Sequence, residues 1–325
     1  MTMDRRAFLS LGLGFGAAAA CRGAGLFTGA KADYDDALTV FLSDVHVCGA
    51  PFARWTYTRD ELAKRVATIL AMRPLPRRVV VFGDIAFGGG DIRDYQAAKP
   101  QIDLLEHAGI KVVLGTGNHD RRNTMQEVFP DCAKDSPVPG RIVSVTDLGS
   151  ADLVLLDSLR GEDGKYEGPV DGALDAAQQE WLADFLPRRT RPVFVGAHHA
   201  ARELSVKGRP IVSLLKRSPT CAGWIHGHDH VWMKHGLYGW GDANEDVVRS
   251  LTLPSGGLWG DIGYVTFRTS PDAARADLVQ LDHWFNDCYR KGETRPAVDQ
   301  AILDENQGQF CRFPYARALR HPRRA

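Results

Sequence analysis

The sequence predicts an α/β protein that opens with parallel strand–helix–strand units. Between Thr39 and Leu114, short apolar runs of strand type alternate with two longer stretches of helical periodicity. This alternation is typical of parallel βαβ units. From Arg141 onward, runs of strand type follow with little helix between them, which indicates further sheet structure. Because no internal repeat or long linker interrupts the chain, we expect a single domain over residues 31–325.

The first half of the chain contains the predicted βαβ units. Thr58 and Glu61 have the spacing of a capping box, which predicts a helix that begins at Arg59. Pro74 and Pro76 then end that helix. The predicted elements are the strand Thr39–Leu42, the helix Arg59–Met72, the strand Val79–Phe82, the helix Asp91–Ala108 and the strand Lys111–Leu114.

The loop after the first predicted strand is rich in aromatic residues. It contains Phe52, Trp55 and Tyr57 beside Pro51. These rings are numerous enough to line a pocket, and they could equally pack the loop against the domain. Both interpretations stay open at the level of the sequence.

The second half of the chain is richer in strand patterns. Residues 161–172 are polar and rich in glycine, which predicts a mobile loop. The strand patterns after residue 246 predict strands of a second sheet. The predicted elements are the strands Ile142–Val145 and Leu153–Leu156, the helix Leu174–Leu186, and the strands Pro192–Val195, Cys221–Ile225, Val247–Val248, Leu251–Leu253 and Tyr264–Phe267.

Composition and charge exclude some classes of function. The 325 residues are 44% hydrophobic and 25% charged, with a formal net charge of zero. A neutral chain creates no overall field that would attract nucleic acid. The basic C-terminal tail, Arg312–Arg324, is interpreted as a solvated end rather than a binding arm.

The N-terminus has the pattern of an export signal. Arg5 and Arg6 directly precede the uncharged run Phe8–Ala20, which is shorter than the roughly 20 apolar residues of a membrane span. The paired arginines resemble a twin-arginine signal, so we expect export to the periplasm. A membrane-anchoring helix is the alternative. The run Ala18–Cys21 resembles a lipoprotein cleavage site, which would leave a lipid anchor on Cys21. Ordinary cleavage after Ala20 fits equally well.

Five small polar clusters each follow an apolar run of strand type. An apolar run that stops at such a cluster is typical of a buried strand that opens into an active-site loop. The clusters offer carboxylates, imidazoles and an amide without cysteine, a ligand set that suits Zn, Mn or Fe better than Ca or Mg. Taken singly, a histidine such as His198 is more often a core residue, and Asp84 could simply form a turn. The clusters are Asp44–His46, Gly83–Asp84, Gly117–Asp120, His198–His199 and Gly227–His230.

In this order, the clusters resemble the signature of the calcineurin-like metallophosphoesterases: DxH, GD, GNH[DE], a lone His and GHxH. The resemblance extends from Thr39 to Phe267. The stretches between the motifs look most similar to the class III cyclic-nucleotide phosphodiesterases, because Leu155–Ser158 is followed by a glycine-rich loop and a helix that contains Trp181. The resemblance implies a four-layer α/β/β/α sandwich of two mixed sheets flanked by helices, with the site along one edge.

The resemblance also implies a dinuclear centre that hydrolyses phosphate esters. Two ions of Mn, Fe or Zn would acidify a bridging water and clamp the phosphoryl group. His119 would protonate the leaving oxygen, with Asp120 orienting its ring. The first ion is expected on Asp44, His46, Asp84 and His230, and the second on Asn118, His198, His228 and the other oxygen of Asp84. Three arginines are candidates for binding the phosphate group of the substrate, and for each the alternative is a solvent-facing role. They are Arg121, Arg122 and Arg202.

Four further positions qualify the resemblance. His199 and His226 adjoin predicted ligands and are expected to support them or to pack. Ala200 stands where this family commonly has proline, which weakens the inference about substrate more than the inference about metal. Phe87 stands where purple acid phosphatases carry a tyrosine ligand, and a phenyl ring cannot bind a metal ion.

These features predict an exported metal-dependent phosphodiesterase that acts on small nucleotides or similar diesters. An exported phosphomonoesterase is the alternative enzyme, because a fold by itself does not assign the substrate. A non-catalytic metal-binding scaffold is the alternative from another class, although every expected ligand and His119 are present. The expected partner is a small-molecule phosphate ester, and the neutral charge argues against a long nucleic acid.

Overall fold

The computed structural model describes residues 33–50, 55–161, 171–204, 209–236, 248–284 and 300–315. These residues, from Tyr34 on, belong to one structural unit. The predicted export signal and Cys21 lie outside the described residues, as does most of the glycine-rich loop after Gly161. None of the helices described combines the length and the hydrophobicity needed to cross a lipid bilayer.

The first sheet is built on the predicted βαβ units. The helix α3 (Tyr57–Ala71) connects β1 to β2, and α4 (Ile92–His107) connects β2 to β3. These three strands pair in parallel, so their carboxyl ends share one edge of the sheet. Across the sheet the order is β12 (Phe310–Pro314), β11 (Ala273–Trp284), β10 (Gly260–Thr269), β1 (Tyr34–Leu42), β2 (Leu75–Val81) and β3 (Lys111–Leu114).

The second sheet is also mixed. Its central strands β5, β6, β7 and β9 pair in parallel, while β4 and β8 pair antiparallel at its two edges. Across the sheet the order is β4 (Ser144–Asp147), β5 (Asp152–Leu155), β6 (Val193–Gly196), β7 (Cys221–His226), β9 (Arg249–Thr252) and β8 (Met233–Gly236).

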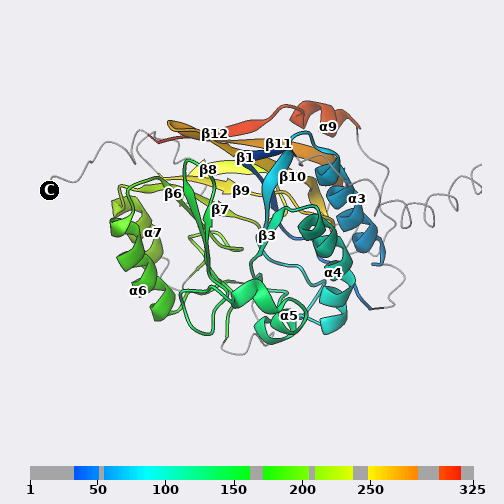
Figure 1. The fold of residues 1–325 in the computed structure, drawn as a ribbon, viewed down its shortest axis with the longest axis horizontal. Helices are drawn as coiled ribbons and strands as arrows, with labels where there is room; N and C mark the ends of the chain where they lie inside the picture. Colours follow the sequence, from blue (N-terminus) through cyan, green and yellow to red (C-terminus); the bar gives the residue numbers. More distant parts are fainter. Residues whose placement is uncertain are drawn as a thin grey trace, which may run out of the picture. The chain divides into compact units, whose positions relative to one another are not determined.

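The two sheets pack face to face, with helices on their outer faces. Phe41 and Phe82 from the first sheet share a buried cluster with Phe194 and Ile225 from the second. A second cluster joins the outer face of the second sheet to α6 (Ala176–Phe185) and α7 (Arg209–Arg217). Figure 1 shows α3 and α4 on the opposite side of the paired sheets. The predicted four-layer α/β/β/α sandwich is confirmed.

Two predictions about the C-terminal half are wrong. The strand around Tyr264–Phe267 belongs to the first sheet, because β10 pairs antiparallel with β1, with Val40 opposite Thr266. The basic tail does not begin at residue 312, because β12 completes the first sheet and buries Phe313 and Tyr315 completely. An alternating pattern identifies a strand but not its partner strand, so neither pairing could be deduced from the sequence.

The predicted capping box at Thr58 is also wrong. The helix α3 begins at Tyr57, and the hydroxyl of Thr58 accepts a hydrogen bond from the Cys48 backbone N–H. The Glu61 carboxylate instead pairs with Arg65, at 2.5 Å. By contrast, Asp91 caps α4 as that helix's predicted start implies, because its side chain accepts from the N–H of Arg93 at 2.9 Å.

Candidate functional site

The predicted metal ligands all lie just beyond the carboxyl ends of strands. Parallel strands place their carboxyl ends at one edge, where open α/β sheets normally bind their ligands. Here both sheets contribute to that edge. In the first sheet Asp44 and His46 follow β1, Asp84 follows β2 and Asn118 follows β3, and in the second sheet His198 follows β6 while His228 and His230 follow β7.

The ligand atoms converge to short distances. His46 Nε2 lies 3.2 Å from His230 Nε2 and 3.5 Å from Asp84 Oδ2. His230 Nε2 in turn lies 3.2 Å from Asp44 Oδ1. The same Asp84 Oδ2 lies 3.2 Å from His198 Nε2. Asp84 therefore stands between the His46 side and the His198 side, which is the place of a bridging ligand.

Three of these ligand atoms are buried without a hydrogen-bond partner: Asp44 Oδ1, Asn118 Oδ1 and His198 Nε2. A buried polar atom that makes no hydrogen bond is costly, and a native structure rarely keeps one without a reason. Asp44 Oδ1 and His198 Nε2 are 3.8 Å apart. A carboxylate oxygen and an imidazole nitrogen are both common metal ligands, and here they lie close together in the interior, so the residues present suit a metal ion.

The second nitrogen of three of the histidine rings is held by a backbone carbonyl. His46 Nδ1 donates to Phe87 O at 3.4 Å, His198 Nδ1 to Phe82 O at 3.0 Å, and His230 Nδ1 to Trp259 O at 3.1 Å. Each bond keeps a proton on Nδ1, so Nε2 is the nitrogen left to bind a metal ion. Metal-binding histidines are typically oriented in this way.

The backbone of the site is strained. The non-glycine residues with positive φ in the described part of the chain are Asp44, His46, Asp84, His228 and His230, with φ between 44° and 70°. All five are predicted ligands. Residues other than glycine rarely adopt this left-handed backbone conformation, so the surrounding structure must stabilise it. Strain concentrated on the ligands indicates that their positions serve a function.

Electrostatics favour a cation at the same place. Burial alone would raise the pKa of Asp44 and Asp84, but the histidines around them hold both pKa values well below the usual range. Burial lowers the pKa of His46 to about 3, so its ring is neutral. Burial would also lower the pKa of His198, but Asp84 and Asp44 raise it to about 9. A bound cation would take the place of the His198 proton.

A family model described as calcineurin-like phosphoesterase matches residues 38–232, which include every predicted ligand. The chain belongs to the calcineurin-like phosphoesterase family. A probable cyclic nucleotide phosphodiesterase of Rhodopseudomonas palustris is 25% identical over 256 residues, which cover 75% of this chain and 82% of that protein. A dimetal phosphatase from Danio rerio has the same fold, with a TM-score of 0.57 and 17% identity over 74% of this chain and 95% of that one.

In this phosphoesterase His119 lies at the mouth of the site. Its ring is half-buried, and its centroid is 4.9 Å from that of His46. One of its nitrogens, with His46 and Asp84, forms a cluster whose ligand atoms lie within 4.8 Å of one another. The backbone N–H of His119 donates to Asp84 Oδ1 at 2.8 Å. These contacts fix the loop that carries His119 against the bridging carboxylate.

Asp120 clamps two loops of the site together. Its Oδ1 accepts from the Ala86 N–H at 3.0 Å and from the Tyr95 hydroxyl at 3.1 Å, and its Oδ2 accepts from the Gly117 N–H at 2.9 Å. The Ile85 N–H lies within 3.3 Å of both oxygens. Asp120 therefore holds the Asp84 loop to the His119 loop, while its predicted contact with the His119 ring stays a prediction.

The prediction that Arg122 grips phosphate is wrong. Its side chain is buried, and it pairs with the buried Asp157 through Nε at 2.6 Å and Nη2 at 2.9 Å. Its Nη1 donates to Gly161 O at 2.7 Å. A guanidinium with these partners is not available to a substrate. An arginine three residues from the predicted acid His119 looks the same in the sequence whether it points outward or inward.

The other two candidate arginines are less buried than Arg122. Arg121 is half-buried, and its Nε is buried without a hydrogen-bond partner, so it stays a candidate for contacting phosphate. Arg202 forms an ion pair with Glu203 at 3.0 Å. It also lies 3.8 Å from Asp229, which stands in the sequence between the predicted ligands His228 and His230. Two carboxylates already balance its charge, which makes it the weaker candidate.

Tyr95 is a residue of the site that no sequence signal marks. It is fully buried on α4, and its hydroxyl donates to Asp120 and accepts from the Arg121 N–H at 2.8 Å. An aromatic residue on a helix looks like ordinary core. His226, in contrast, packs as expected, because its ring nitrogens bond Gly227 O and the Thr252 hydroxyl.

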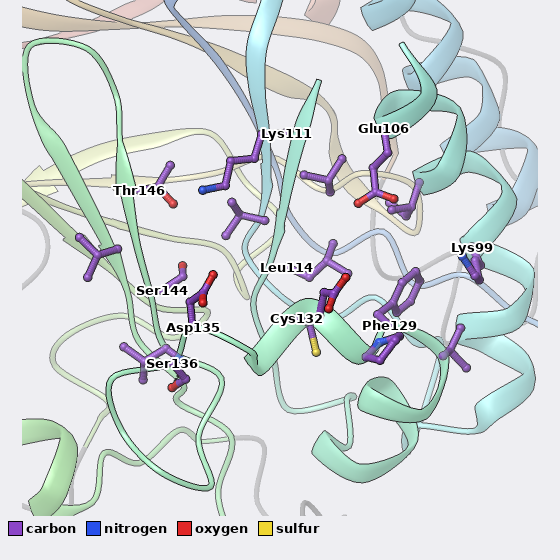
Figure 2. Close-up of a pocket in the computed structure, with 18 residues that line it drawn as sticks. Lys99, Glu106, Lys111, Leu114, Phe129, Cys132, Asp135, Ser136, Ser144 and Thr146 are labelled. Atoms are coloured by element: carbon purple, nitrogen blue, oxygen red, sulfur yellow. Dashed lines mark hydrogen bonds between the residues drawn. The ribbon is translucent and has the colours of Figure 1, made fainter. Parts of the chain in front are cut away.

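A cavity of about 370 Å³ lies elsewhere, between α4, β3, β4 and the 3₁₀ helix η2 (Pro130–Ala133). Figure 2 shows its labelled lining residues, which include Lys99, Lys111 and Cys132. None of the predicted ligands lines it. Its apolar floor and mixed charges offer no convergent set of chemical groups, so the candidate site is the ligand cluster and not this cavity.

Proposed function

We propose that this phosphoesterase is a metal-dependent phosphodiesterase for small nucleotides or similar organic diesters. The observation that carries the proposal is the convergence of unpartnered, buried ligand atoms from both sheets beneath the half-exposed His119. The 25% identity to a probable cyclic nucleotide phosphodiesterase supports a diester rather than a monoester as substrate.

The seven ligands fit two ion positions that share Asp84. When bound, two ions of Mn, Fe or Zn supply a water nucleophile at neutral pH and positive charge against the phosphoryl oxygens. The first position would be formed by Asp44, His46, Asp84 and His230, and the second by Asp84, Asn118, His198 and His228. The short distances from Asp84 Oδ2 to His46 and to His198 support this division.

The chain's own residues perform the remaining work. His119 donates a proton to the leaving oxygen, because it is the half-exposed imidazole beside the His46 side of the cluster. Asp120 and Tyr95 keep its loop in place through the hydrogen bonds described above. Arg121 contacts a non-bridging oxygen of the phosphate from the other end of that loop.

The location of this activity is part of the proposal. The paired Arg5 and Arg6 before an apolar run support export to the periplasm, where the protein is soluble or anchored through Cys21. An exported enzyme meets diesters outside the cytoplasm, so scavenging of such compounds is the role that fits best.

Initial rates test the proposal directly. Manganese-loaded protein is given bis(p-nitrophenyl) phosphate and p-nitrophenyl phosphate, and we expect kcat/KM for the diester to be at least about tenfold larger. His119→Ala is expected to lower kcat for the diester by about 10²–10⁴, the usual value of general acid catalysis. His107→Ala, an exposed histidine on α4, is the matched control. Faster cleavage of the monoester would move the assignment to a phosphomonoesterase.

A further inference from the structure

An aromatic wall flanks one side of the metal site. We define this wall by Trp55, Tyr57, Phe87 and Trp259, all of which are half-buried. The Trp55 ring centroid lies 5.4 Å from that of Phe87 and 6.3 Å from that of Tyr57. These residues come from three separate segments of the chain, so their proximity is a product of the fold and not of sequence spacing.

The wall is joined directly to the ligands. The Trp259 ring stacks on the His230 ring at 4.1 Å and 26°, and the Trp259 carbonyl accepts from His230 Nδ1. The Phe87 carbonyl accepts from His46 Nδ1 in the same way. The Tyr57 hydroxyl donates to Leu258 O at 2.9 Å, which ties the Trp55 end of the wall to the Trp259 end.

The wall also adjoins the leaving-group side of the site. Gly88, which follows Phe87, is exposed, and a Cβ atom there would come within 3.9 Å of His119 Nδ1. The chain directly after Phe87 therefore lies beside the imidazole that is proposed to protonate the leaving group. The half-buried rings place apolar surface beside the polar centre, and apolar surface gains free energy when a ligand covers it.

We propose that the aromatic wall binds a planar ring carried by the ester group of the substrate, with Trp55 as the principal stacking surface. This inference rests on the proposed function, and it identifies the residues that select the organic part of the diester. Planar rings stack on aromatic side chains with little dependence on their substituents, so aryl groups and nucleobases share the required chemistry.

Calorimetric binding of phosphate monoesters tests the wall without requiring turnover. The manganese-loaded full chain is titrated with methyl phosphate, phenyl phosphate and thymidine 5′-phosphate. We expect the two ligands with rings to bind at least about tenfold more tightly than methyl phosphate, a factor within the range measured for stacking a base on an aromatic side chain. Thymidine 5′-phosphate binding more tightly than phenyl phosphate would identify a nucleobase as the ring.

Variants at the wall separate stacking from general damage. Trp55→Leu is expected to lower the preference for phenyl phosphate over methyl phosphate by about tenfold, and Trp55→Phe to restore part of it. Trp181→Leu removes a partly buried tryptophan of α6 and serves as the matched control. If Trp55→Leu does not fold, Phe87→Leu provides the same comparison.

The outcomes distinguish this inference from the proposed function. Equal dissociation constants for phenyl and methyl phosphate, or a preference that survives both wall variants, would overturn the aromatic wall. Ring-dependent binding that Trp55→Leu removes would support it, even if no diester were cleaved. In that case the proposed phosphodiesterase activity would be rejected, and the proposed binding of a planar ring by the aromatic wall would be kept.

Discussion

The variant Arg122→Met distinguishes between two roles of this arginine, phosphate binding and a buried ion pair with Asp157. Removing one partner of a buried ion pair costs about 3–5 kcal/mol, because the other charge is left buried without compensation. Here the loss falls at the lower end of that range, because Asp157 keeps hydrogen bonds from the Thr116 hydroxyl and the Ile142 N–H. We therefore expect Arg122→Met to lower the free energy of unfolding by about 3 kcal/mol.

Equilibrium urea unfolding of the metal-free protein measures this loss. With a slope of about 3 kcal/mol/M, the expected midpoint falls by about 1 M. Asp157→Asn in the same chain removes the uncompensated charge and should recover part of the loss. Arg121→Met is the matched control and should cost less than about 1 kcal/mol. An unchanged midpoint together with a raised KM for Arg122→Met would refute the structural role and return Arg122 to phosphate binding.

Three further predictions follow from the fold, the site and the N-terminus. Because the pKa of His198 in the metal-free site is about 9, a metal ion must displace its proton, so manganese affinity should rise with pH up to about 9 and then level off. Phe313→Ala should destabilise the protein by about 3–5 kcal/mol in urea unfolding, because that ring is fully buried between the sheets. Arg5→Lys with Arg6→Lys should retain the protein in the cytoplasm in cell fractionation.

Each of these predictions has a result that counts against it. Manganese affinity that is flat between pH 6.5 and pH 9 would show that His198 is neutral without metal. An exposed position such as Phe310, which is 43% exposed on the same strand, is the control for Phe313, and equal effects at the two positions would place β12 outside the core. Undiminished export of the double-lysine variant would remove the twin-arginine assignment.

The metal ligands could be predicted from the sequence because their chemistry is local. Each ligand follows an apolar run, and residue type, order and strand position together specify the cluster. The six predicted aspartate and histidine ligands fall into groups with closely spaced ligand atoms, and Asn118 Oδ1 is buried without a hydrogen-bond partner. The βαβ half was predictable for the same reason, since periodicity and caps such as Asp91 act over a few residues.

The remaining features depend on contacts between distant residues. Nothing near Tyr264 reveals that β10 pairs with β1, and nothing near Arg122 reveals that Asp157 lies opposite it. The aromatic loop was recognisable, but the partner of Trp55 in the wall is Phe87, from the next strand's loop. Tyr95 is the same kind of case, because only the fold brings its hydroxyl to Asp120.

The number of metal ions per chain tests the central claim most directly. After loading with manganese and removal of free metal, elemental analysis should give two ions per chain for the wild type and about one for Asn118→Ala, which loses a ligand of a single position. Asn123→Ala, at an exposed position of the helix α5 (Arg122–Val128), should keep both ions. One ion or none in the wild type, or two ions in Asn118→Ala, would contradict the two-position centre built around Asp84.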